Sequence, residues 1–152
     1  MSRVIINTDG GSIGNPGPAA IGIVVKIQNL KSEVKNYSKF IGETTNNIAE
    51  YQAVIFGLNK LKRLIGKTKT RQTEVEIRSD SKLIVNQLNG TYKIKHRELF
   101  PLFIEIWNLK QDFKKVDFIY ISRKENKPAD KLVKKVLAEH KHRKKDLKNL
   151  IL

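Results

Sequence analysis

The sequence predicts a single α/β domain in which helices pack on a mixed sheet of five strands. Two observations carry this prediction. Segments rich in β-branched residues come first, over 3–8, 20–27 and 33–41, and they read as an antiparallel meander. After them, segments with helical spacing of apolar residues alternate with two further strands, 74–78 and 116–121. A meander followed by such alternation is typical of a mixed sheet covered by helices.

The first strand leads into a polar, glycine-rich segment over 9–18 that we expect to form a tight loop. Glycine adopts positive φ without strain, and proline interrupts strand pairing. A turn at Asn29 is expected to join the second and third strands as a hairpin. The first 41 residues are therefore expected to form three of the five strands.

Several helices follow the meander. Thr44–Asn47 offers N-cap side chains for the first of them. On the third, Phe103 and Trp107 are expected to lie in the core. The expected elements are a helix from about 46 to 65, a basic loop over 66–71, a helix over 82–88 ending at Asn89-Gly90, a helix over 98–113, and a last helix that begins near Lys127-Pro128.

Length and composition limit the class of protein. With 152 residues, 39% of them hydrophobic, the chain fits one domain with one core. No apolar run approaches the roughly 18–20 residues that span a bilayer, and the N-terminus turns polar too early for a signal peptide. A cytoplasmic protein with no membrane partner is expected. Because the chain has no cysteine, disulfides and thiolate metal sites are excluded.

The charge points to a polyanionic partner. Thirty Lys and Arg against fifteen Asp and Glu give a net charge of +15. Residues 123–148 hold eleven Lys and Arg and four Asp and Glu, so that this stretch alone carries +7. Such an excess favours binding to nucleic acid through phosphate contacts, and a solvated basic surface without a partner is the alternative. Charge alone identifies no reaction.

Four carboxylates stand at or near the ends of predicted elements. Asp9 follows the first strand, Glu50 lies in the first turns of a helix, Asp80 follows the fourth strand, and Asp130 opens the last helix. Strand ends and helix starts can converge on one pocket. Carboxylates without nearby Cys or His suit the hard cations Mg²⁺ or Mn²⁺, and each acid taken alone is equally explained as a helix cap.

Read together, the local sequences resemble type 1 ribonuclease H. The opening motif is Thr8–Pro18, the second is Thr44–Ala53, the third is Ser79-Asp80-Ser81 and the fourth is Arg123–Asp130. The resemblance covers residues 3–138, nearly the whole chain. We therefore assign residues 1–140 to a catalytic domain with the ribonuclease H-like fold and residues 141–152 to a basic, then apolar, C-terminal tail.

The resemblance implies an endoribonuclease that cleaves the RNA strand of an RNA–DNA hybrid and leaves 5′-phosphate and 3′-hydroxyl ends. Two ions, Mg²⁺ or Mn²⁺, would be held by the four carboxylates. Asp9 would bridge both ions, and Asp130 would complete the ion that activates water. Glu50 and Asp80 would hold the ion that faces the leaving group. A monomer is expected, and double-stranded RNA stays open as a second substrate.

The resemblance also implies a set of substrate contacts. Asn15, Asn46 and Asn47 match polar positions that read 2′-hydroxyls from the minor groove, although each asparagine is also an ordinary turn or cap residue. Main-chain groups of Gly11 and Ser12 would assist, and Thr45 matches a contact to a DNA phosphate.

Three departures from the family pattern accompany the resemblance. Many relatives carry a histidine before the last aspartate; here Arg123 is the nearest substitute, or else a solvated residue. The basic helix that many relatives insert is replaced by the short segment 90–97, and no separate hybrid-binding domain is expected ahead of the catalytic one. Substrate binding would then depend on scattered cations of the 67–71 loop, of residues 93–97 and of the tail. The chain's three histidines are assigned no metal.

Other functions were weighed against the enzyme. A catalytically inactive binding module would gain nothing from four mutually repelling acids. A structural protein with carboxylates as caps would show no metal dependence. Integrases, resolvases and the nuclease domain of reverse transcriptases share the fold, but the asparagine set favours hybrid cleavage. For the tail, we expect Leu147, Leu150, Ile151 and Leu152 to dock on the domain and hold the cations of 141–145 near substrate, with a disordered tail as the alternative.

Overall fold

A computed structural model describes residues 3–28 and 31–151. Within this part of the chain, one sheet has the strand order β3-β2-β1-β4-β5. β1 pairs antiparallel with β2, and β2 pairs antiparallel with β3, whereas β4 runs parallel to both β1 and β5. The strands are β1 (Arg3–Ser12), β2 (Gly17–Gln28), β3 (Glu33–Thr44), β4 (Glu74–Ser79) and β5 (Lys115–Tyr120). The predicted five-stranded mixed sheet is confirmed.

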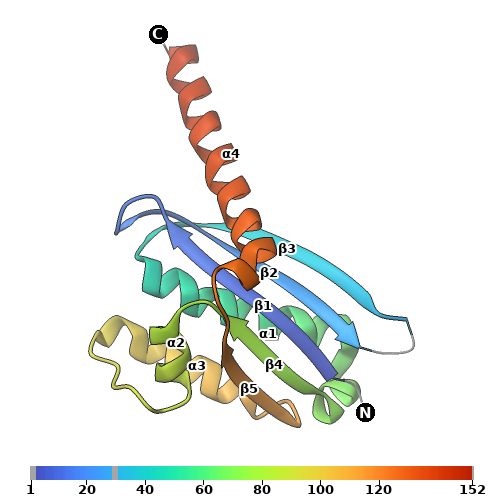
Figure 1. The fold of residues 1–152 in the computed structure, drawn as a ribbon. Helices are drawn as coiled ribbons and strands as arrows, with labels where there is room; N and C mark the ends of the chain where they lie inside the picture. Colours follow the sequence, from blue (N-terminus) through green and yellow to red (C-terminus); the bar gives the residue numbers. More distant parts are fainter. Residues whose placement is uncertain (1–2, 29–30, 152) are drawn as a thin grey trace.

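Helices cover both faces of this sheet (Figure 1). One face carries α1 (Asn46–Gln72), α2 (Lys82–Leu88) and α3 (Phe100–Lys110), and the other carries α4 (Lys127–Ile151). Short 3₁₀ turns, η1 (Arg97–Leu99) and η2 (Lys124–Asn126), precede α3 and α4. No described helix combines the length and apolar character needed to cross a membrane.

The core is divided between the two faces. The larger cluster lies between the sheet and α1, α2 and α3, and it includes the fully buried Ile6, Tyr51 and Leu58. A smaller cluster of Ala20, Val133 and Leu137 joins α4 to the sheet. α4 is therefore held to the sheet by its first four turns, the last contact being the ring of His140 on Phe40.

β1 and β2 are longer than the sequence predicts. We expected a strand that ends at Thr8 and a loop over 9–18, but β1 continues to Ser12 and β2 begins at Gly17. The reason is that β1 keeps one of its two partner strands. Its pairing with β4 ends at Thr8, whereas its pairing with β2 continues to Ser12. The predicted turn at Asn29 lies outside the described residues.

The predicted basic loop over 66–71 is helical. α1 kinks at Gly66, whose φ of 82° is a conformation that favours glycine, and then continues to Gln72. The hydroxyl of Thr70 donates to the carbonyl oxygen of Gly66 at 2.7 Å and stabilises the turn after the kink. The cations of this segment therefore lie on a helix.

α3 is shorter than the predicted helix, and one of its residues was placed wrongly. Trp107 was expected in the core, but its side chain is 55% exposed. Phe103 is half-buried against the core, as expected. Ile106 and Leu109 face the core, and Trp107 shares the opposite face with Phe100 and Ile104.

α4 runs on well beyond the sheet (Figure 1). The prediction that the apolar tail residues dock on the domain is wrong, because Leu147, Leu150 and Ile151 are 59%, 82% and 84% exposed. The alternative of a disordered tail is equally wrong for residues 141–151, which are helical. Leu152 lies outside the described residues.

Candidate active site

The parallel pairing of β1 with β4 places two of the predicted acids side by side. Thr8 is opposite Ser79 in the register, so Asp9 and Asp80 follow the last paired residues of adjacent strands. Parallel strands open their carboxyl ends at one edge of a sheet. Asp9 therefore lies beside the point where the chain leaves β4. The chain then begins α2, whose N-cap is Ser81.

Glu50 reaches the same edge because α1 packs closely on β1. A Cβ on Gly10 would lie 2.3 Å from the main-chain carbon of Ala49, so only glycine permits this approach. The main-chain N–H of Gly10 donates to Oε1 of Glu50 at 2.5 Å. Thr45 caps the helix by accepting a hydrogen bond from the N–H of Ile48 at 3.2 Å, which confirms the predicted cap.

The three carboxylates form a compact acidic cluster. One oxygen from each of Asp9, Glu50 and Asp80 lies within 4.8 Å of the others. Burial, and next the charge of Asp80, raise the pKa of Asp9 from 3.8 to about 7. Burial, and next the charge of Asp9, raise the pKa of Glu50 well above its usual range. Without a counter-ion, the cluster is under electrostatic strain.

One buried amide orients Asp80. Nδ2 of Asn126, in η2, donates to Oδ2 of Asp80 at 3.1 Å and to the carbonyl oxygen of Thr8 at 2.9 Å. Its Oδ1 accepts from Nδ2 of Asn7 at 3.2 Å, and the side chain of Asn126 is fully buried. Asn126 therefore links β1, β4 and the segment before α4.

Asp130 lies at the rim of the same cleft but outside the compact cluster. Its helix packs against β2 at Gly22, where a Cβ would lie 2.7 Å from the carbonyl oxygen of Ala129. Oδ2 of Asp130 is 2.8 Å from Nζ of Lys134, one turn further along α4. Asp130 thus already has a partner cation, whereas no ion pair involves Asp9, Glu50 or Asp80 in the part of the chain that the structure describes.

The donor set fits a hard divalent cation. All of the converging atoms are carboxylate oxygens, the type of ligand that Mg²⁺ and Mn²⁺ prefer. The raised pKa values of Asp9 and Glu50 show that the cluster lacks positive charge. A bound cation would favour the ionised forms and relieve the repulsion.

A hydrogen-bonded network beside the cluster ties the β1–β2 turn to the start of α1. Oδ1 of Asn46 accepts from the main-chain N–H of Ser12 at 2.9 Å and from its hydroxyl at 3.1 Å. Oδ1 of Asn15 accepts from the main-chain N–H of Asn46 at 3.0 Å. Because Oδ1 of Asn46 is engaged, the group that it offers to a ligand is its Nδ2 donor.

A cleft of about 570 Å³ unites these groups. The four acids, Gly11, Ser12, Asn46 and Asn47 all line it, and so do Arg123 and Lys134. Asn15 and Thr45 are not in the lining: they contact Asn46 and Ile48 instead. Of the predicted site residues, then, these two lie outside the lining of the cleft.

The comparison with known families decides the relationship. A family model described as "Reverse transcriptase-like" matches residues 7–136. LC11-RNase H1, isolated from compost by a metagenomic approach, has a structure that is similar with a TM-score of 0.82 and 42% sequence identity, covering 92% of this chain and 99% of that one. This chain belongs to the type 1 ribonuclease H family.

Two further relatives extend the comparison. The bifunctional protein Rv2228c of Mycobacterium tuberculosis is 37% identical over 130 residues, 86% of this chain and 34% of the relative. Ribonuclease HI of Halobacterium salinarum is 32% identical over 89% of this chain and 64% of the relative. The chain thus spans about a third of the length of the mycobacterial protein. LC11-RNase H1 has also been solved in complex with an RNA/DNA hybrid. This chain is 44% identical in sequence to the protein in that complex, and the two structures are similar with a TM-score of 0.78. The similarity covers 87% of this chain and 94% of that one.

Sequence reasoning missed two residues of this candidate site. Asn126 stands within the fourth motif but was given no role, since the sequence cannot show that its amide is buried beside Asp80. Lys134 had a usable signal, because it stands four residues after Asp130 on a helix, where opposite charges meet.

Proposed function

We propose that this protein is a metal-dependent endoribonuclease that cleaves the RNA strand of RNA–DNA hybrids, with products that carry 5′-phosphate and 3′-hydroxyl ends. The observation that carries the proposal is the compact cluster of Asp9, Glu50 and Asp80 in a chain of the type 1 ribonuclease H family. A close structural relative has been solved with an RNA/DNA hybrid, which supports the choice of substrate.

We infer that Asp9, Glu50, Asp80 and Asp130 together hold two Mg²⁺ or Mn²⁺ ions. Bound there, such ions supply positive charge to the scissile phosphate and lower the pKa of an attacking water. Asp130 has Oδ1 available as a ligand, because only its Oδ2 is paired with Lys134, and Lys134 lines the cleft where it could face the phosphate. No Ser, Cys or His nucleophile is required, because water attacks the phosphate directly.

The residues around the acids keep them in position. The Gly10 N–H holds Oε1 of Glu50, and the amide of Asn126 holds Oδ2 of Asp80. The bond from Gly10 favours the ionised form of Glu50, which is the form that binds a cation, and the bond from Asn126 orients Asp80. The chain's own contribution to catalysis is therefore a rigid arrangement of oxygen ligands that already exists before the cation binds.

Substrate selection is assigned to the network at the β1–β2 turn. Nδ2 of Asn46 is placed to donate to a 2′-hydroxyl oxygen, while Asn15 fixes the turn that presents Gly11 and Ser12. Asn47 lines both the acidic cleft and a neighbouring hollow of about 520 Å³. That hollow also has Lys93 and Lys95 in its wall, which suits contact with the partner strand's phosphates. Thr45 and Arg123 are proposed as further phosphate contacts.

The test is cleavage of end-labelled duplexes by the purified protein. A hybrid, a DNA duplex and an RNA duplex of the same sequence are each incubated with EDTA, Mg²⁺ or Mn²⁺, and the product ends are mapped. Cleavage of the hybrid's RNA strand, dependent on the cation and lost in Asp9→Asn, is expected. The RNA duplex decides whether double-stranded RNA is a second substrate. No cleavage of the hybrid with either cation would contradict the proposal.

A further inference from the structure

One face of α4 forms part of the wall of the acidic cleft. Asp130, Val133, Lys134 and Leu137 all line the cleft, and all stand on the same side of the helix because they are three or four residues apart. Beyond His140, whose ring stacks on Phe40 of β3, the helix leaves the sheet, and residues 141–151 are exposed. The cleft-lining side of α4 therefore continues into solvent.

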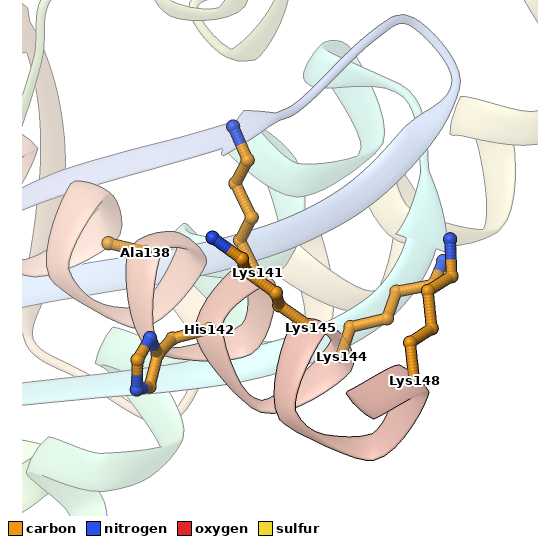
Figure 2. A pocket seen from close by; sticks show the side chains of 6 residues that line it. All are labelled: Ala138, Lys141, His142, Lys144, Lys145 and Lys148. Carbon is orange, nitrogen blue, oxygen red and sulfur yellow. The ribbon is translucent and has the colours of Figure 1, made fainter. Parts of the chain in front are cut away.

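Four lysines continue that side of the helix. Lys141 stands four residues after Leu137, and Lys144, Lys145 and Lys148 follow at steps of three or four. At 100° per residue, these four positions fall within about 60° of Asp130 around the helix axis. We call these four residues the lysine face. They line a shallow hollow of about 500 Å³ together with Ala138 and His142. Figure 2 shows the lysine side chains projecting from the helix and His142 pointing away from them.

The lysine face has no internal neutralisation. In the described residues, no ion pair involves any of the four lysines, and the nearby Asp146 lies against His142 instead, at 3.4 Å. Like charges at spacings of three and four residues destabilise an isolated helix by about 0.2–0.5 kcal/mol per pair. A helix segment that packs on nothing and repels itself is suited to an anionic partner.

The apolar residues of the extension stand on a different side. Val136 and His140 face the sheet, where the ring of His140 stacks on Phe40 at 4.2 Å. Leu147 continues that side at about 100° from Asp130 around the helix axis, Leu150 stands further away at about 160°, and Ile151, at about 60°, borders the lysine face. Leu147 and Leu150 thus lie apart from the lysine face, and the charged side is the one that is continuous with the cleft.

We propose that the lysine face binds the sugar–phosphate backbone of the same duplex that occupies the cleft, at a point outside the catalytic cluster. This proposal rests on the proposed function for the identity of the duplex. Its grounds are the continuity of the lysine face with Asp130 and Lys134 and the four uncompensated charges. Phosphate contacts of this type fix register and affinity without reading sequence.

The helix geometry fixes the reach of this contact. From Asp130 to Lys141 is about 16 Å along the helix axis and to Lys148 about 27 Å, at 1.5 Å per residue. For a duplex whose axis follows α4, at about 3.4 Å per base pair, these distances correspond to about five to eight base pairs from the scissile phosphate. A duplex of 8 base pairs centred on the cleft would stop short of the lysine face, whereas one of 24 would pass it.

The experiment compares two variants that each lose four positive charges. The test variant carries Lys141→Gln, Lys144→Gln, Lys145→Gln and Lys148→Gln. The control carries Lys26→Gln, Lys35→Gln, Lys131→Gln and Lys135→Gln, which lie on β2, on β3 or on other sides of α4. Binding to 8- and 24-base-pair hybrids is measured by fluorescence anisotropy in EDTA over a range of salt concentrations, and circular dichroism checks that α4 stays helical.

The test variant should lose about tenfold to hundredfold in affinity for the 24-base-pair hybrid near 0.1 M salt, with a log–log salt slope reduced by about 2–4. For the 8-base-pair hybrid, the affinity of the test variant should fall no more than the affinity of the control variant. Replacement of the same four lysines by arginine should keep the wild-type slope. Equal losses in the test and control variants, or equal losses on both duplex lengths, would overturn the proposal.

Two further measurements distinguish this inference from the proposed function and from dimer formation. Cleavage of the 8-base-pair hybrid with Mg²⁺ reports on the proposed function alone, because that duplex does not reach the lysine face. If the extension instead serves a second copy of the chain, sedimentation velocity will show a dimer that Leu147→Ser with Leu150→Ser converts to a monomer. The lysine variant will then bind the 24-base-pair hybrid as the wild type does, which overturns the phosphate contact.

Discussion

The side chain of Asn126 holds Asp80 and the end of β1 at the same time. Its Nδ2 donates to Oδ2 of Asp80 at 3.1 Å and to the carbonyl oxygen of Thr8 at 2.9 Å. Asp80 is a member of the acidic cluster, and Thr8 is the residue before Asp9. A single buried amide thus sets the spacing between two strands at the point where their acids converge.

Asn126→Ala should therefore weaken cation binding as well as the fold. We expect a loss of about 1–3 kcal/mol in the free energy of unfolding and an increase of about 10–100-fold in the Mg²⁺ concentration needed for half-maximal cleavage. The matched control is Asn89→Ala, which loses a hydrogen bond to the carbonyl oxygen of Phe118 and touches no carboxylate. A similar Mg²⁺ requirement in both variants would show that Asn126 is only structural.

Asp9→Asn should abolish cleavage and stabilise the metal-free protein. The substitution removes one charge from a buried cluster whose members repel each other. At pH 7.5 in EDTA, we expect the free energy of unfolding to rise by about 1–2 kcal/mol. Urea unfolding and single-turnover cleavage test the two parts separately. Residual turnover near the wild-type rate would contradict the role of Asp9 in the cation site.

The stability of the metal-free protein should depend on pH through Asp9. Its pKa is about 7 in the folded state against 3.8 for the ordinary group, so the folded state binds the extra proton. The contribution of Asp9 to stability is thus complete below about pH 4 and is lost as the pH rises through about 7. Urea unfolding in EDTA should show a wild-type value that falls relative to that of Asp9→Asn over this window. A constant difference between the two proteins would contradict the raised pKa.

Asn46→Ala should reduce discrimination more than it reduces binding. Nδ2 of Asn46 is the donor available to a 2′-hydroxyl, while Oδ1 already accepts from Ser12. We expect affinity for a hybrid to fall by about 1–2 kcal/mol relative to a DNA duplex of the same sequence. Asn86→Ala, which removes an amide bonded within the α2 region, serves as the control. Equal losses on both duplexes would limit Asn46 to holding the turn.

The sequence predicted the sheet because its strands are dense in β-branched residues and separated by clear turns. Of the four acids predicted to converge, Asp9, Glu50 and Asp80 form the compact cluster, and they were found because the strands before Asp9 and Asp80 and the helix that carries Glu50 were all recognised. The extension of β1 was missed because glycine-rich, polar residues normally signal a loop. Here Gly10 is required by the packing of α1, and pairing with β2 keeps the segment extended.

Features that depend on tertiary contacts were less accessible. Trp107 has the composition of a core residue, but the core side of α3 is already filled by Ile106 and Leu109. The helical state of residues 67–71 was hidden by Gly66, which kinks α1 without ending it. Asp130 was predicted among the four acids, yet its pairing with Lys134 appears only once α4 is built.

The unbroken course of α4 from Asp130 to Ile151 has a further consequence. The lysine face and the cleft-lining residues lie on the same side of α4. The helix therefore fixes both the distance and the angle about its axis between them. Insertion of one alanine after Ala138 would rotate the lysine face by about 100° from the cleft with almost no change in length. Insertion of seven would restore the angle to within about 20° and move the lysine face outward by about 10.5 Å. The angular setting and the reach of the extension can therefore be varied independently by the length of a single helix.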